Sequence, residues 1–229
     1  MYEVRFYKGN YIERQRQANA EGAVAYVEQH FNASASSSAG YVVVITGSNA
    51  SQVSRNWGQW YSQAINREFQ VPIGGDDGIK VGGYNGRGDG NLKYTSMPAI
   101  LLEPLFVSNP AHAEIARSEE GQRRLARVLV DSIERFFPTG GLIAFSVGHK
   151  YKRSNPNDRG AAVVGGGTEA DIAEQVLEKA AAMLRDSTGP VEGRHLKVVH
   201  GETLLLDQRL DEDAELVWDP ERSILRIVG

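Results

Sequence analysis

The segment LIAFSVGHKYKRSNPNDRGAAVVGGGTEADIAEQV, residues 142–176, contains the pattern that decides the fold. An apolar run over Leu142–Val147 predicts a buried strand, and a polar loop leads from it to a helix that begins near Thr168. Thr168 and Asp171 resemble an N-cap arrangement, and the helix is expected to reach about Arg185. A strand, a polar loop and an amphipathic helix form the repeating unit of α/β proteins.

Outward from this segment, the same alternation of strands and helices continues. Val24–Val27 and Ala99–Leu102 are short apolar runs that predict buried strands. The β-branched residues of Tyr41–Thr46 predict a further strand. Amphipathic helices are expected over Tyr11–Ala20, Ser51–Phe69 and Glu114–Phe137. We therefore predict an α/β fold with a mostly parallel twisted sheet flanked by helices.

Two segments fall outside this alternation. Residues 72–94 are dense in glycine and show no periodicity, which predicts a long loop, and such loops are usually functional or mobile. From His195 onward the chain alternates in short β-like runs, which predict a C-terminal extension of short β-hairpins. We expect one main domain over residues 1–200 and a β-rich tail over 201–229 that packs on the same domain.

Composition excludes several classes of protein and of site. A net charge of −4 gives no electrostatic footprint for nucleic acid. No stretch approaches the roughly 20 apolar residues of a membrane span. The N-terminal residues 1–19 lack an apolar core, so no secretory signal is expected. Because cysteine is absent, a bound metal would need histidine, aspartate or glutamate ligands.

Four residues that bind metals or move protons fall where one rim of the sheet is expected. His30, Glu103 and His149 follow predicted strands, and ligands gather at the carboxyl ends of such strands. Glu169 lies in the first turn of a predicted helix, where the helix dipole favours a carboxylate. Taken singly, His30 could be a core histidine and Glu169 a helix-start charge. Together they match a zinc shell of two histidines and one glutamate, with a second carboxylate left as general acid or base.

The same segments resemble the zinc-dependent N-acetylmuramoyl-L-alanine amidases of the type 3 class. The segment quoted first is similar to the family's opening motif, which carries a Gly-His loop, a Gly-Ala pair and a glutamate that starts a helix, here His149, Gly160-Ala161 and Glu169. The segment ERQRQANAEGAVAYVEQHFNAS resembles its next motif through Arg14, Ala18-Asn19, His30 and Asn32. MPAILLEPLFVSNPAHAEIA resembles the closing motif, the most specific of the three, through Glu103, Phe106 and Ser108-Asn109-Pro110.

The order of the motifs and two positions depart from the family. The opening motif follows the closing one, as a circular permutation would give if residues 138–141 join the usual ends. The family has an aspartate two residues before the glycine of its Gly-His pair, where this chain has Ser146. It has Ser-Ile before the second histidine, where this chain has Glu28-Gln29. In the family, these positions are expected to support the metal ligands. Because this chain has different residues there, the resemblance does not tell which residues support the ligands here.

The resemblance implies a hydrolase in which Zn²⁺ is held by His149, Glu169 and His30, with Glu103 as the catalytic acid and base. The implied substrate is peptidoglycan, cleaved at the amide between N-acetylmuramic acid and L-alanine in the cell envelope. Arg14 and Asn32 are expected to position the substrate or to support the site. Two alternatives stay open: a zinc peptidase acting on stem peptides, and a non-catalytic module that binds peptidoglycan or a partner.

Overall fold

The computed structural model describes residues 1–186 throughout and, beyond them, the strand segments 195–200, 203–209, 215–219 and 224–228. The chain divides into two units, Met1–Ser187 and Thr188–Gly229. The elements in chain order are β1 (Tyr2–Phe6), α1 (Tyr11–Ala20), β2 (Ala25–Gln29), β3 (Val43–Thr46), α2 (Gln52–Phe69), β4 (Ile79–Val81), β5 (Gly83–Tyr84), β6 (Arg87–Gly88), the 3-10 turn η1 (Asp89–Asn91), β7 (Ala99–Glu103), α3 (Pro110–Arg117), α4 (Glu119–Phe136), β8 (Gly141–Val147), α5 (Glu169–Asp186), β9 (His195–His200), β10 (Thr203–Arg209), β11 (Glu215–Asp219) and β12 (Ile224–Val228). Among the described helices, none is long and apolar enough to cross a lipid bilayer.

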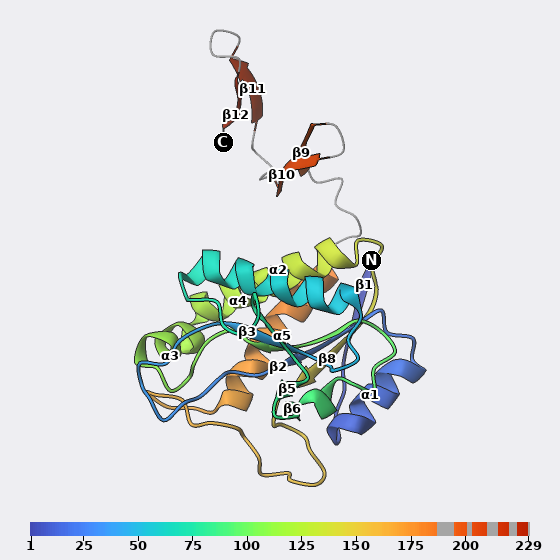
Figure 1. Cartoon of the computed structure of the whole chain (residues 1–229), viewed down its shortest axis with the longest axis vertical. Helices are drawn as coiled ribbons and strands as arrows, with labels where there is room; N and C mark the ends of the chain where they lie inside the picture. The colour runs from blue at the N-terminus through green and yellow to red at the C-terminus, as the bar shows by residue number, and fades with distance from the viewer. Residues whose placement is uncertain (187–194, 201–202, 210–214, 220–223, 229) are drawn as a thin grey trace. The chain divides into compact units, whose positions relative to one another are not determined.

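The first unit is built on a six-stranded sheet with the order β1-β8-β2-β7-β3-β4 (Figure 1). The neighbours β1, β8, β2 and β7 run parallel to one another, and β4 runs parallel to β3. Only the pairing of β3 with β7 is antiparallel among the neighbours of this sheet. The predicted α/β fold, a mostly parallel sheet flanked by helices, is confirmed.

The second unit contains two antiparallel pairs of strands, β9 with β10 and β11 with β12. Hairpin pairing of these β-like runs agrees with the pattern in the sequence. The boundary expected at residue 200 falls between His200 and Thr203, which are paired across β9 and β10. That the tail packs on the main domain stays a prediction.

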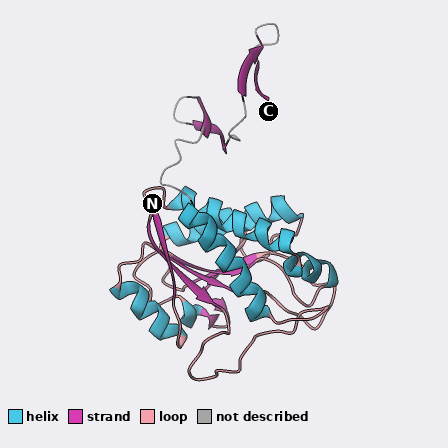
Figure 2. Cartoon of the chain, turned by 180° about the vertical axis from the view of Figure 1, so that it is seen from behind, coloured by secondary structure: helices cyan, strands magenta, loops and turns pink. Residues whose placement is uncertain are grey.

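Helices cover both faces of the six-stranded sheet (Figures 1 and 2). α2, α4 and α5 form a layer over one face, while α1 and η1 lie together on the other. Because side chains alternate along a strand, β7 sends Ile100 to the larger core and Leu101 to the smaller one. On β2 the same period places Tyr26 in the smaller core. Glu28 and His30 follow Tyr26 at two-residue steps, so they point toward the face that carries α1.

Strand β1 was not predicted from the sequence. Tyr2 and Val4 are buried while Glu3 and Arg5 are exposed, so the period-two signal is present in the segment. The strand lies at the edge of the sheet and pairs only with β8 among the described strands. Charged residues on the outward side are typical of such an edge, and they hide its strand character in a hydrophobicity pattern.

Two further expectations were wrong. The single helix predicted over Glu114–Phe137 is two helices, because Ser118 ends α3 and its side chain caps α4 by accepting a hydrogen bond from the Gly121 N–H. The glycine-rich residues 72–94 are not a structureless loop, since β4 joins the central sheet and β5 pairs with β6. In the β5–β6 hairpin, Asn85-Gly86 forms a two-residue turn with positive φ at both positions.

Candidate functional site

Three side chains that could hold a metal ion converge at the carboxyl ends of β2 and β8. His30 directly follows β2, His149 lies two residues after β8, and Glu169 is the first residue of α5. Their ligand atoms all lie within 4.8 Å of one another. Oε1 of Glu169 is 3.1 Å from Nδ1 of His30 and 3.2 Å from Nε2 of His149. The structure thus brings together the three residues predicted as metal ligands.

A glycine between the strand and the loop allows the two imidazoles to approach each other. A β-carbon at Gly148 would lie 2.6 Å from the ring of His30, so any larger residue would displace that ring. The ring centroids of His30 and His149 are 4.8 Å apart. His149 itself has a φ of 61°, in the left-handed region that few side chains adopt. This backbone turns its ring back over the sheet edge toward His30.

Each imidazole presents one nitrogen to Glu169 and the other to a second carboxylate. Nε2 of His30 is 2.8 Å from Oε1 of Glu28, and Nδ1 of His149 is 3.0 Å from Oδ1 of Asp158. Ionised carboxylates only accept hydrogen bonds, so each outer nitrogen donates. An acceptor on the outer nitrogen fixes the tautomer and the ring orientation of a metal-binding histidine.

The position of Glu169 is fixed by backbone donors as well as by the imidazoles. Its Oε1 accepts from the Phe31 N–H at 3.2 Å and its Oε2 from the Ala161 N–H at 2.9 Å. Burial raises the pKa of Glu169, but the hydrogen bonds and charges of His149 and His30 outweigh burial and hold the pKa far below the usual range. The carboxylate is therefore ionised at neutral pH, as a metal ligand must be.

The donor set fits a zinc ion. In a tetrahedral shell with zinc–nitrogen and zinc–oxygen bonds near 2.0–2.1 Å, neighbouring ligand atoms lie roughly 3.3 Å apart. The separations from Glu169 Oε1 to His30 Nδ1 and His149 Nε2, 3.1 and 3.2 Å, are close to this value. Two imidazole nitrogens and one carboxylate oxygen are also the ligand types of catalytic zinc sites, in which a fourth position stays open.

The carboxylates raise the pKa of both imidazoles. Burial lowers the pKa of His30, but hydrogen bonds to Glu169 and Glu28 overcome this and raise it to about 10. The pKa of His149 is also raised, because its hydrogen bond to Glu169 and that carboxylate's charge outweigh the effect of burial. A metal at this position would replace the proton on His30 Nδ1, so binding would release a proton.

Glu103, at the end of β7, lies beside the three ligands without joining their hydrogen-bond network. Its Oε2 atom is buried and has no hydrogen-bond partner among the described residues. Burial raises the pKa of Glu103 to about 7, the positive charge of His30 opposes this, and the negative charge of Glu169 adds to it. A carboxylate with a pKa near neutrality can both accept and donate a proton at neutral pH.

The two residues expected to position substrate or support the site lie in different environments. Arg14 is fully buried, and its guanidinium donates to Ser146 Oγ at 2.8 Å and to the carbonyl oxygens of Gly9 and Val147 at 2.8 and 2.7 Å. These contacts fit a supporting role. The Nδ2 group of Asn32 is buried and has no partner within the described part of the chain, so it is a donor that a substrate oxygen can satisfy.

Glu28 and Asp158 were missed as site residues by sequence reasoning. Glu28 was noted only as a departure from the family, yet it precedes His30 by two positions on a strand, which places both side chains on one face. That spacing is a signal that could have identified it. Asp158 lies in an irregular loop nine residues after His149, and no periodicity links the two.

The two departures from the family pattern face each other. Glu28 and Ser146 are paired residues of the neighbouring strands β2 and β8, and Ser146 Oγ donates to Glu28 Oε2 at 3.0 Å. The carboxylate and the small polar side chain have therefore exchanged strands relative to the family pattern. In this arrangement the carboxylate lies within hydrogen-bond distance of His30.

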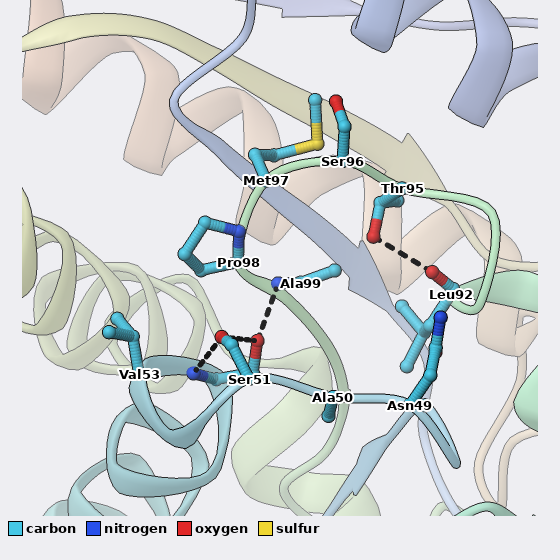
Figure 3. Close-up of a pocket in the computed structure, with 12 residues that line it drawn as sticks. Asn49, Ala50, Ser51, Val53, Leu92, Thr95, Ser96, Met97, Pro98 and Ala99 are labelled. Carbon is cyan, nitrogen blue, oxygen red and sulfur yellow. Dashed lines mark hydrogen bonds between the residues drawn. The ribbon is translucent and has the colours of Figure 1, made fainter.

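A separate small pocket lies at the opposite end of β7 (Figure 3). Its volume is about 290 Å³, and Ala99, the first residue of β7, lines it together with Ser51, Leu92 and Met97. Glu103 is four residues further along the same strand, roughly 13 Å away at the usual strand rise. This pocket therefore does not belong to the cluster of metal-binding residues.

Comparisons with known proteins identify the family. The sequence model described as N-acetylmuramoyl-L-alanine amidase matches residues 6–135, more than half of the chain. The matched region contains His30 and Glu103, and it ends before His149 and Glu169. A comparison with curated proteins gives no match.

Solved structures of amidases are also similar to this chain. The catalytic domain of CwlV, the amidase from Bacillus (Paenibacillus) polymyxa var. colistinus, is 25% identical with a TM-score of 0.47 over 56% of this chain. An amidase from Clostridium difficile 630 is 23% identical with a TM-score of 0.48 over 57% of this chain. This chain spans 66% of the length of each of these two structures. By the match of the family model, the chain belongs to the N-acetylmuramoyl-L-alanine amidase family.

Proposed function

We propose that this protein is a zinc-dependent peptidoglycan hydrolase of the cell envelope. It cleaves the amide bond between the lactyl group of N-acetylmuramic acid and L-alanine of the stem peptide. The observation that carries the proposal is the convergence of His30, His149 and Glu169 within 4.8 Å, with the unpaired carboxylate of Glu103 beside them. Family membership supports the choice of bond.

The three ligands hold the metal, and the rest of the site handles protons. His30 Nδ1, His149 Nε2 and Glu169 Oε1 are the ligand atoms, since these face one another. When bound, zinc supplies Lewis-acid catalysis by polarising a carbonyl oxygen and making water more acidic. With a divalent cation bound, two neutral imidazoles and one carboxylate would leave the site with a net positive charge, which would favour the negative charge that develops on the substrate oxygen.

Glu103 transfers the proton. Its carboxylate accepts a proton from the attacking water as the new carbon–oxygen bond forms, and it donates that proton to the departing nitrogen as the carbon–nitrogen bond breaks. The products are a lactyl carboxylate and the free amine of L-alanine, so atoms and protons balance. Asn32 Nδ2, a buried donor with no partner in the described structure, is placed to hold a substrate oxygen.

We also propose that the chain is a circular permutant of the family fold. The C-terminal end of α5 lies beside β1, because Arg185 donates to the carbonyl of Val4 at 3.2 Å. The first residue of the chain lies beside β8, because the Gly141 N–H donates to the carbonyl of Met1 at 3.1 Å. A chain that places residues 141–186 directly before Tyr2 would therefore need only a short connection to keep the same sheet.

Glu103→Gln tests the function, because the amide is nearly isosteric but cannot take up a proton. We expect zinc content to match the wild type, measured by metal analysis, and cleavage of purified peptidoglycan to fall at least 100-fold. Mass spectrometry of wild-type digests should show stem peptides with a free L-alanine amine. Cleavage inside the stem peptide would identify a peptidase instead, and a metal-free preparation with full activity would remove zinc from the mechanism.

A further inference from the structure

A buried carboxylate on β2 has no part in the mechanism described so far. Glu28 is completely buried, and its Oε1 lies 2.8 Å from Nε2 of His30, the nitrogen that faces away from Glu169. Burying an ionised carboxylate is costly unless hydrogen bonds and nearby positive charge compensate. The contacts around Glu28 therefore indicate which role this buried charge has in the site.

Glu28 is held in one position by donors from separate parts of the chain. Asn91, in η1, donates to the same oxygen that faces His30, at 2.5 Å. The other oxygen accepts from Ser146 Oγ at 3.0 Å and from the Tyr26 hydroxyl at 3.4 Å. With both oxygens engaged, the carboxylate cannot rotate away from the imidazole without breaking buried hydrogen bonds and leaving their donors without a partner.

Arg14, a fully buried cation, is tied to β8, the strand beside Glu28. Arg14 donates to Ser146, and Ser146 donates in turn to Glu28. This chain of contacts supplies positive charge on the side of Glu28 that is opposite His30. As a result the carboxylate can stay ionised with no proton taken from the imidazole, and it keeps its acceptor character toward Nε2.

We propose that Glu28 is a positioning residue: it keeps the hydrogen of a neutral His30 on Nε2 and thereby turns the lone pair of Nδ1 toward the metal position beside Glu169. The inference rests on the proposed function, because it assigns the role of a residue to the same metal centre. It concerns this chain specifically, since the carboxylate stands on β2 at a position where the family has serine. Asn91 extends the positioning contact to the end of the glycine-rich residues 72–94.

The direct test measures zinc affinity and the hydrogen bond of His30 Nε2. Glu28→Gln keeps the shape of the side chain and removes its charge, so we expect zinc binding to weaken 10- to 100-fold in competition with a chelator. In the zinc-loaded wild type, proton NMR should show the Nε2 hydrogen of His30 shifted to low field, because a carboxylate accepts it. In the zinc-loaded variant this signal should move to higher field.

Tyr26→Phe is the matched control. It lies on the same strand and face as Glu28 and removes one hydrogen bond to the same carboxylate without touching His30. We expect its zinc affinity to stay within twofold of the wild type. An equal loss in both variants would mean that any disturbance of this buried cluster weakens the metal site, and it would overturn the specific role of Glu28.

A double exchange, Glu28→Ser with Ser146→Asp, separates two possible roles of Glu28. Glu28 could act through its contact with His30, or it could act by balancing the charge of Arg14. The exchange keeps a carboxylate beside Arg14 but removes the acceptor from His30. We expect stability to recover relative to Glu28→Ser alone, while zinc affinity stays at least tenfold below the wild type. Full recovery of zinc affinity would show that Glu28 acts by balancing Arg14, which overturns the proposal.

The failure of this inference can be told apart from the failure of the proposed function. A wild-type protein that binds no zinc contradicts the function itself. A wild type that binds zinc tightly, with Glu28→Gln equal to it in affinity and in the NMR signal of the His30 Nε2 hydrogen, contradicts only the role of Glu28. If Glu28→Gln does not fold, the exchange variant and Asn91→Ala, which loosens the same carboxylate, carry the test.

Discussion

Each imidazole of the candidate site has a carboxylate beside its outer nitrogen, but the two carboxylates lie in different parts of the fold. His30 takes its outer acceptor from Glu28, a fully buried residue two positions earlier on the central strand β2. His149 takes its acceptor from Asp158, a partly exposed residue of an irregular loop that also pairs with Lys152. The first support is fixed by the sheet, and the second depends on a loop and a surface ion pair. The half of the site that contains His30 and Glu28 is therefore rigid, and the half that contains His149 and Asp158 is more adjustable.

The largest effect on zinc affinity is expected at Glu169, which contacts both imidazoles. Glu169 contacts both imidazoles through one oxygen, so Glu169→Ala should remove a ligand and leave the two rings to repel each other. We expect zinc affinity to fall more than 1000-fold and peptidoglycan cleavage to disappear, measured by chelator competition and product analysis. Retention of stoichiometric zinc in this variant would break the comparison, because the two halves would then not share a ligand.

Removing the charge of Glu28 and that of Asp158 in separate variants tests the difference between the two halves of the site. Glu28→Gln leaves a buried cluster with Arg14 unbalanced and should lower the free energy of unfolding by about 3 kcal/mol. Asp158→Asn removes a partly exposed charge and should lower it by less than about 1 kcal/mol. Denaturant unfolding of the metal-free proteins measures both values. Equal losses in the two variants would contradict the distinction between a rigid and an adjustable half.

The pH dependence of stability tests Glu103, whose carboxylate interacts electrostatically with both His30 and His149. Because burial raises the pKa of Glu103 to about 7, the folded protein binds this proton more tightly than the unfolded chain does. Its contribution to stability is therefore complete below the unfolded pKa of about 4.5 and is lost as pH rises from there through 7, by about 3 kcal/mol. The difference in unfolding free energy between wild type and Glu103→Gln, both metal-free, should fall between pH 5 and 8.

A difference that does not change with pH would place the pKa of Glu103 near its ordinary value. In that case its role as a group that both accepts and donates a proton near neutrality would lose its support. The measurement uses metal-free protein so that a bound cation does not lower the pKa of this carboxylate directly.

Much of the sheet could be predicted from the sequence because its central strands are apolar on both faces. The run before Glu103 is continuous in Ala, Ile and Leu, and β2 is apolar over its first three residues before it becomes polar at Glu28, where the site begins. The edge strand β1 was missed because only alternate residues are buried. The break at Ser118 was missed because the apolar stripe continues past a residue whose side chain caps the next helix.

The ligand types could be predicted, but their supporting partners could not. Strand ends converge in any parallel sheet, so His30, Glu103 and His149 were found from local patterns. The hydrogen bond from Ser146 to Glu28 joins residues 118 positions apart, and its existence depends on which strands become neighbours. Local periodicity holds no information about such a pairing. The order of the motifs, which differs from that of the family, gives no information about it either.

The placement of β1 beside β8 also has a consequence for how the polypeptide acquires its structure. Tyr2 pairs with Gly141, and the ligand residues begin at His30 and finish at Glu169, so the decisive contacts join distant parts of the chain. Contacts of such high sequence separation slow folding, because a long loop must close before they form. During synthesis the first strand and the first histidine must wait for most of the domain to emerge. A nascent fragment that ends before Glu169 therefore lacks one of the three candidate metal ligands, and the complete set can come together only late in synthesis.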